Sequence, residues 1–127
     1  MKRELTSHKV NGLNDALAIE ALDEPGPGGA CHLYSIRTDE PRSEYQAPAV
    51  RTDIAFQKGP IGEVGINGIS NEALLAIVED RLAGFQSGPF ACGSNQMALI
   101  HVQSAMDVLH ARTKERVERG VEGTLQR

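Results

Sequence analysis

Three arginines near the end of the chain carry the clearest chemistry in the sequence. Arg112, Arg116 and Arg119 recur at intervals of three to four residues, which places them along one side of a helix. A guanidinium group stays charged and presents its donors in a planar fork that matches a phosphate or a carboxylate. Because an unpaired buried charge is costly, a cation on a packing face needs an anion opposite it. The spacing therefore indicates either internal ion pairs or a site for an anionic ligand.

A second group of candidate residues flanks a predicted turn at the other end of the same helix. Phe85 offers a ring on which a base can stack, and Asn95 offers a hydrogen-bonding amide, with Phe90 in the turn between them. Seventeen residues separate Asn95 from Arg112, which is about 25 Å along a helix. One small ligand cannot contact both ends in a single chain. In an antiparallel pair across a twofold axis, however, the tip of one hairpin meets the arginine end of its partner.

Each of these residues also has a purely structural interpretation, which the sequence alone leaves open. The arginines can pair with Glu115, Glu118 and Glu122, as charges on a helix surface commonly do. Phe85 closes an apolar stripe and can be a core residue. Asn95 can satisfy free backbone amides at the start of its helix.

The sequence favours binding without catalysis and predicts no cofactor and no metal site. It contains no Gly-x-Ser-x-Gly, His-Glu-x-x-His or Cys-x-x-Cys motif. Cys31 and His32 are neighbours on a predicted strand and should point to opposite faces. The glycine-rich run Gly59–Gly68 lacks the Gly-Lys-Ser/Thr ending of a phosphate-binding loop, so we interpret it as structural.

Composition excludes several classes of function. A net charge of −4 and a pI of about 5.5 argue against a protein that coats DNA or RNA, which usually has a broad basic face. No apolar run approaches the roughly 18 residues that span a bilayer, and the N-terminus lacks the apolar core of a signal peptide. Two cysteines without metal-type spacing favour a reducing cytoplasm. We therefore expect a cytoplasmic protein with neither a nucleic-acid polymer nor a membrane as its partner.

The elements that must position the candidate residues fall into two parts. Residues 1–69 are rich in glycine, proline and short apolar runs, which predicts a small antiparallel sheet. The predicted strands form two pairs, Leu17–Leu22 with Cys31–Ile36 and Thr52–Gln57 with Ile61–Ile66. The polar stretch 38–51 between the pairs is long for a connection, which indicates a functional flap or a segment without fixed structure.

Residues 70–127 are predicted to form an antiparallel helical hairpin. Ser70 or Asn71 can cap the first helix, Ser94 can cap a second helix that runs roughly to Arg119, and Gly120 suits a left-handed C-terminal cap. The fold class is thus α+β, with both parts in one compact unit. Two helices cannot bury both their faces against each other, and aromatic residues make up only 4% of the chain. We therefore expect the hairpin to form a homo-oligomer, with an antiparallel dimer as the simplest form.

Several motifs together resemble the first family of phage Thoeris anti-defence proteins, over most of the chain and most strongly over residues 52–124. They are Phe56–Leu82, Phe85–Gln86, Gly88–Cys92 and Arg112–Thr124. The resemblance implies a non-enzymatic sponge that binds glycocyclic ADP-ribose, the signal of the bacterial Thoeris defence, and keeps it from its effector. The hairpin is also similar to that of anti-CBASS sponges, which capture cyclic oligonucleotides.

The resemblance also implies site residues and an assembly. The family pocket matches Phe85, Asn95, Arg112 and Arg116 here, and Phe90 and Arg119 are further candidates. Family members form dimers and, in several cases, hexamers with additional sites for cyclic di- or trinucleotides. Two other functions stay open at this point. One is a small enzyme that hydrolyses cyclic nucleotides, and the other is a phage adaptor whose hairpin only oligomerises.

Overall fold

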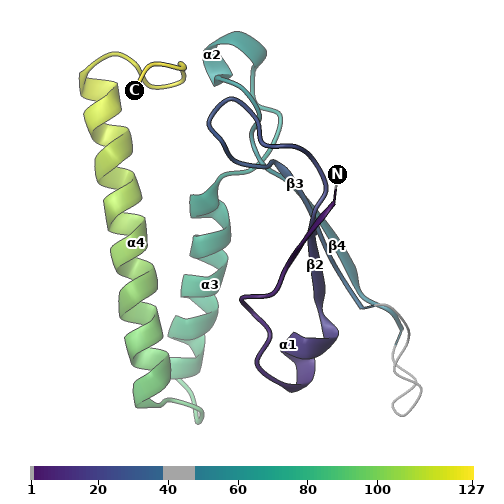
Figure 1. Ribbon diagram of the computed structural model, residues 1–127. Helices are drawn as coiled ribbons and strands as arrows, with labels where there is room; N and C mark the ends of the chain where they lie inside the picture. Colours follow the sequence, from purple (N-terminus) through teal and green to yellow (C-terminus); the bar gives the residue numbers. More distant parts are fainter. Residues whose placement is uncertain (1, 39–47) are drawn as a thin grey trace. The chain divides into compact units, whose positions relative to one another are not determined.

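The computed structural model describes residues 2–38 and 48–127, which divide into two compact units (Figure 1). The first unit comprises residues 1–59 and 66–69, and the second comprises residues 60–65 and 70–127. Residues 39–47, the larger part of the predicted flap, lie outside the described ranges. No helix in these ranges is both long enough and apolar enough to cross a membrane.

The first unit is built on an antiparallel sheet of four strands in the order β1-β2-β3-β4. The predicted antiparallel sheet and its first strand pair are confirmed, because β2 pairs with β3 and places Ile19 opposite Ile36. The ring of Tyr34 meets that of Phe56 edge to face, with 5.7 Å between their centroids. The strands are β1 (Arg3–Leu5), β2 (Ala18–Ala21), β3 (Leu33–Arg37) and β4 (Arg51–Ala55).

A half-buried carboxylate, that of Asp23, fixes the start of β3. Asp23 accepts hydrogen bonds from the backbone amides of His32 and Leu33 at 3.0 and 3.1 Å. The bond from Leu33 is the main reason why the pKa of Asp23 lies below its ordinary value of 3.8, and His32 lowers it further. Cys31 donates its thiol hydrogen to the backbone oxygen of Asp23. These side chains therefore serve the strand turn.

Three elements within residues 1–69 differ from the sequence-based expectation. The strand predicted at Ile61–Ile66 is wrong, since a short helix α2 occupies Ile61–Val64. Pro60 precedes it with a φ of −72°, and Gly65 leaves it with a φ of +74°, so both flanking residues favour a helical turn over a strand. A strand β1 and a short helix α1 (Gly12–Ala16) were not predicted, because the N-terminal segment is polar and shows no hydrophobic period.

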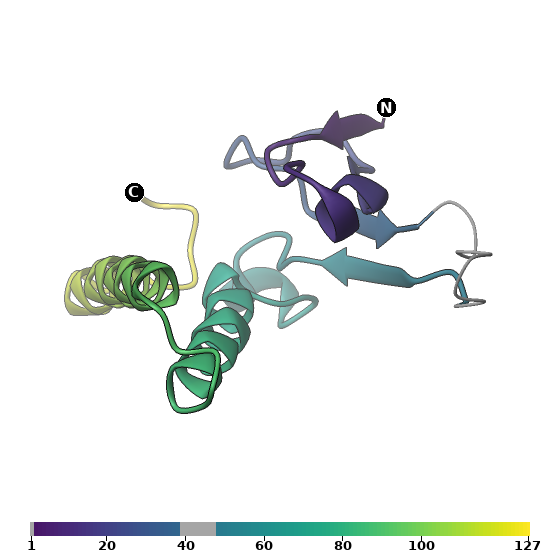
Figure 2. The same cartoon turned by 90° about the horizontal axis from the view of Figure 1, so that it is seen from below.

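The second unit contains the predicted helical hairpin, in which α3 (Asn71–Gln86) and α4 (Gly93–Glu118) run side by side (Figures 1 and 2). Ser70 caps α3 and accepts a hydrogen bond from the backbone amide of Ala73 at 3.1 Å, as expected. The prediction of Ser94 as the cap of α4 is wrong. The cap is Cys92, which has an extended backbone and precedes the first helical residue, Gly93. Its sulfur lies 3.4 Å from the amide nitrogen of Asn95 and accepts a hydrogen bond from it.

Gly120 ends α4 as predicted. Its φ of +74° lies in the left-handed region. The amide of Gly120 donates to the carbonyl of Val117, and the amide of Val121 donates to that of Arg116, both at 3.0 Å. This pair of bonds is the Schellman motif, and it turns the chain back toward the last turn of α4.

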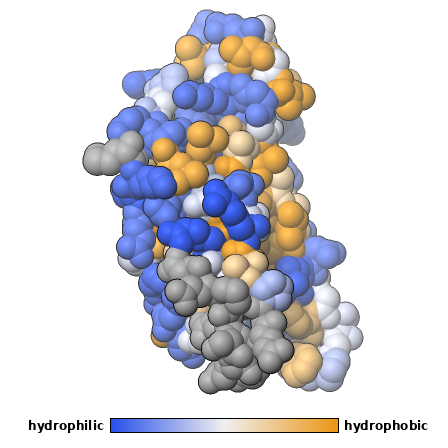
Figure 3. Space-filling model, turned by 90° about the vertical axis from the view of Figure 1, so that its right-hand side faces the viewer, coloured by the Kyte–Doolittle hydropathy of each residue, from blue (hydrophilic) through white to orange (hydrophobic). Residues whose placement is uncertain are grey.

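The hairpin buries little of its apolar surface. Leu99 is the one apolar side chain buried within the described part of the hairpin, with 8% of its surface exposed. Apolar side chains are exposed on the first unit as well. Figure 3 shows one face of the molecule, on which hydrophobic patches lie among hydrophilic side chains. Exposed apolar residues of the hairpin include Ile77, Val78, Met97, Ile100 and Val108. A surface of this kind is typical of a protein that associates with a partner.

Candidate ligand-binding site

The hairpin turn presents two aromatic rings. Phe85 lies in the last turn of α3 with 40% of its surface exposed, and Phe90 lies in the turn itself with 72% exposed. The structural interpretation of Phe85 as a buried core residue is therefore wrong for a single chain. Both rings have accessible surface on which a planar group can stack.

Arg81 lies one helical turn before Phe85 and was missed by the sequence analysis. Its guanidinium carbon is 5.6 Å from the centroid of the Phe85 ring, a cation–π arrangement. The spacing of four residues on α3 could have indicated the pair. Arg81 is also the only lysine or arginine between residues 59 and 111. The turn end of the hairpin thus has one fixed cation, and it is stacked on a candidate site residue.

Asn95 braces the turn and keeps an acceptor available. Its side-chain amide nitrogen donates to the backbone oxygen of Phe90 at 3.4 Å. Gln86 braces the turn from the other side, because it accepts from the amide of Cys92 at 3.0 Å and donates to Gln96 at 3.1 Å. Asn95 therefore has a structural role, but it differs from the expected one, because its side chain donates to a carbonyl and accepts from no backbone amide at the start of α4 within the described residues. Its side-chain oxygen, which has no partner among the described residues, remains available to a ligand.

One of the three arginines near the end of α4 has no partner among the described residues. Arg112 is exposed, and within the described ranges no hydrogen bond or ion pair reaches its guanidinium group. Its charge is therefore available to an external anion without the loss of any internal bond.

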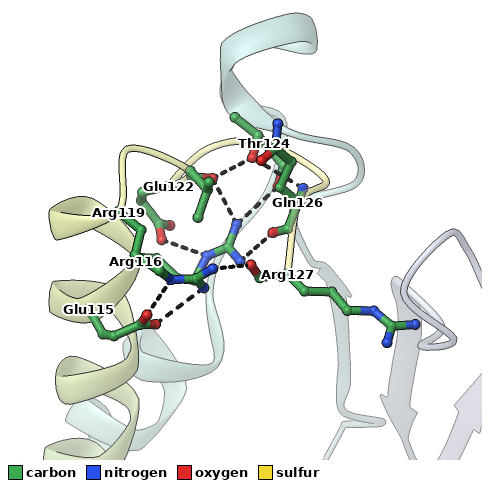
Figure 4. A network of polar contacts seen from close by, with 8 residues as sticks. Glu115, Arg116, Arg119, Glu122, Thr124, Gln126 and Arg127 are labelled. Carbon is green, nitrogen blue, oxygen red and sulfur yellow. Dashed lines mark hydrogen bonds and ion pairs between the residues drawn. The ribbon is translucent and has the colours of Figure 1, made fainter.

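Arg116 is in the opposite situation, since only 6% of its surface is exposed. Its Nε donates to a carboxylate oxygen of Glu122 at 3.0 Å. Its two terminal nitrogens donate to three backbone oxygens of the C-terminal tail, those of Val121, Thr124 and Gln126 (Figure 4). The charge is buried and hydrogen-bonded, as the cost of burying a cation requires.

Arg119 is also occupied. It pairs with Glu115 one turn back on α4 and donates to the backbone oxygen of Arg127 (Figure 4). The interpretation of internal ion pairs is thus correct for Arg116 and Arg119 in a single chain. It does not apply to Arg112.

The two groups of candidate residues lie at opposite ends of the hairpin. Asn95 and Arg112 belong to the same continuous helix of 26 residues, α4, and 17 positions separate them, which corresponds to about 25 Å. Asn95 and Arg112 of a single chain therefore cannot both contact one small ligand.

Other parts of the described chain offer less. No group of three or more His, Cys, Asp or Glu side chains is placed to hold a metal ion in residues 2–38 and 48–127. A cavity of about 300 Å³ in the first unit is lined by Glu4, Ala18, Glu20 and Arg37. Arg37 and Glu20 form an ion pair across it at 3.0 Å, which accounts for their charges.

Comparisons with known proteins point to one family. The model of the Acb2/Tad1 hairpin domain matches residues 48–114, more than half of the chain. The chain is also 48% identical over 71 residues to Thoeris anti-defense 1 of Bacillus phage SBSphiJ7, a match that covers 56% of this chain and 50% of that protein. The matched residues include Phe85, Asn95 and Arg112. The resemblance read from the sequence is confirmed, and the chain belongs to the Acb2/Tad1 hairpin family.

Proposed function

We propose that this protein is a phage anti-defence sponge that binds glycocyclic ADP-ribose between two copies of its hairpin and does not cleave it. The observation that carries the proposal is the separation of complementary groups along the hairpin. Ring and amide groups lie at one end, and an unpaired arginine lies at the other, with about 25 Å between them. An antiparallel pair of hairpins would bring the two ends together twice.

The outer face of α4 supports such a pair. Met97, Ile100 and Val108 recur at the spacing of one helical face, and each has 41% or more of its surface exposed. The buried Leu99 lies on a different side of the helix. Covering this stripe with a second copy would remove apolar surface from water, at about 25 cal/mol for each Å² buried. The same surface could support higher assemblies, including a hexamer.

Each site residue has a role that follows from its chemistry. Phe85 stacks on the adenine base, with Phe90 at the rim, and Asn95 accepts a hydrogen bond from the base or the ribose. The guanidinium group of Arg112, from the other copy, binds a phosphate as a bidentate donor, and Arg116 and Arg119 lie one and two turns further. Arg81 adds positive charge beside the base. No covalent step is required of any of these residues.

Cyclic di- and trinucleotides share the chemistry that this site recognises, namely purine rings and phosphates. They are therefore the second class of ligand to be tested, at this site or at another. The protein would act in the cytoplasm of the infected bacterium, where it would lower the concentration of the free signal. Sequestration of this kind depends on tight binding and slow release.

A binding screen tests the proposal. Cyclic ADP-ribose isomers and cyclic oligonucleotides are added to the purified protein, and unfolding is followed on heating. A ligand present at 100 times its dissociation constant should stabilise the protein by about 2.7 kcal/mol. The complex is then denatured, and the released ligand should have an unchanged mass. A hydrolysed product would instead indicate an enzyme, and stabilisation by no ligand would indicate an adaptor.

A further inference from the structure

The hydrogen bonds of Arg116 divide into a fixed set and a replaceable one. The terminal nitrogens of the guanidinium group face three backbone oxygens, those of Val121, Thr124 and Gln126, at 2.5 to 3.1 Å. The Nε atom faces a side chain, the carboxylate of Glu122, at 3.0 Å. Figure 4 shows the guanidinium group enclosed by this tail.

The fixed set is held by the backbone of the tail. The amide of Gly62 on α2 donates to the oxygen of Gly123 at 3.1 Å, and the amide of Thr124 donates to that of Val121 at 3.1 Å. The amide of Gln126 donates to the side-chain oxygen of Thr124 at 3.2 Å. Gly123 has a φ of +79°, which few other residues adopt easily. These bonds keep the three carbonyls in place whether or not Glu122 is bound.

The replaceable bond lies at the rim. The side chain of Glu122 has 38% of its surface exposed, compared with 7% for that of Arg116. Glu122 can therefore rotate into water without disturbing the backbone oxygens. The Nε edge of a buried guanidinium group would then be open, and that edge requires a negative charge.

We propose that Glu122 is a built-in counter-ion, which occupies the phosphate position on Arg116 in the free protein and leaves when an anionic ligand binds. The inference rests on the proposed function and concerns the same site. The three carbonyls would hold the guanidinium group in orientation while a phosphate oxygen replaces the carboxylate. Arg112 needs no such exchange, because its charge is already unpaired.

Under this proposal, removing the Glu122 carboxylate lowers the stability of the free protein and raises its affinity for the ligand. Glu122 stabilises the free protein through its bond to Arg116, but it competes with the ligand for the same donor. A competing state lowers the apparent affinity in proportion to its population. Removing the carboxylate should therefore weaken the free fold and strengthen ligand binding. A residue with a purely structural role would lower stability and would not increase affinity.

The experiment compares Glu122→Gln with Glu118→Gln. Glu118 is the last residue of α4, is exposed, and makes no hydrogen bond or ion pair within the described ranges. Both substitutions remove one negative charge near the arginines, so a general electrostatic effect is the same in the two variants. Dissociation constants are measured by calorimetry with glycocyclic ADP-ribose and with inorganic diphosphate. The melting temperature of each free protein is measured in parallel.

We expect Glu122→Gln to bind both probes about 3- to 10-fold more tightly than the wild type and to melt at a lower temperature, with Glu118→Gln within about twofold of the wild type. In the wild type, NMR should show the Nε–H signal of Arg116 shifting on addition of ligand. The Glu122 carboxyl signal should move to the value of an exposed carboxylate.

Two results would overturn the inference in different ways. If the wild type binds but Glu122→Gln binds no more tightly than Glu118→Gln, Glu122 is not a competitor and the proposed function is unaffected. If neither the wild type nor Glu122→Gln binds either probe, the proposed function itself is wrong, because removal of a competing charge can only favour an anion.

Discussion

At the scale of single residues, the site was partly predictable from sequence because some of its residues follow a helical period and others do not. Asn95 and Arg112 lie on α4 as expected. The burial of Arg116 was not predictable, since its partners are backbone oxygens of a tail without any hydrophobic period. Arg81 was missed because cation–π contacts depend on side-chain direction as well as on spacing.

The pair of Arg81 and Phe85 gives a prediction at this scale. Arg81→Ala should weaken ligand binding about two- to fivefold, as expected for a cation–π contact of about 0.5–1 kcal/mol at an exposed site. Arg81→Lys retains the charge but loses the planar stack, so it should recover only part of the affinity. Titrations by calorimetry measure both variants. The role of the ring would be refuted if Arg81→Ala weakened binding equally in wild-type and Phe85→Leu backgrounds.

At the scale of elements, the helices were predicted better than the strands. The pattern over 70–127 predicted both helices, the Ser70 cap and the Gly120 stop, because long segments without helix breakers and the residues that cap them leave local signals. The apolar residues of Ile61–Val64 suggested a strand. The segment forms the short helix α2 instead, because Pro60 and Gly65 flank it. The start of α4 was misplaced because the cap is a cysteine, which is not a usual capping residue.

Two glycines of the hairpin should respond to alanine with opposite signs. Gly120 has a φ of +74°, so Gly120→Ala should lower the free energy of unfolding by about 1–2 kcal/mol. Gly84 lies within α3, and an added methyl group would meet no atom within 4 Å. Gly84→Ala should raise stability by about 0.5–1 kcal/mol through helix propensity. Urea denaturation of the free proteins checks both values, and equal effects would contradict the assigned role of Gly120.

At the scale of the whole molecule, the sheet and the hairpin form separate compact units, and the proposed site belongs to the hairpin. The hairpin buries one apolar residue on α4 and leaves Met97, Ile100 and Val108 exposed. A hairpin with so small a core is expected to gain stability from association. The scarcity of large side chains in the sequence predicts that the hairpin associates with a partner. The sequence does not show which face of the hairpin that partner would cover.

The proposed pocket is shared between two copies of the chain, and mixing two inactive variants tests it directly. Asn95→Ala and Arg112→Ala remove groups at opposite ends of α4, so each pure variant lacks one group in both pockets of an antiparallel dimer. A mixed dimer restores both groups in one of its two pockets. Random mixing in equal amounts makes half the dimers mixed, so about a quarter of all pockets should be intact.

The decisive measurement is the amount of glycocyclic ADP-ribose bound by the co-expressed pair, determined by calorimetry beside each pure variant and the wild type. We predict that the pure variants bind none, and that the mixture binds about a quarter of the wild-type amount with wild-type affinity. A mixture that binds no more than the pure variants would show that Asn95 and Arg112 do not meet across two copies, and would contradict the shared pocket.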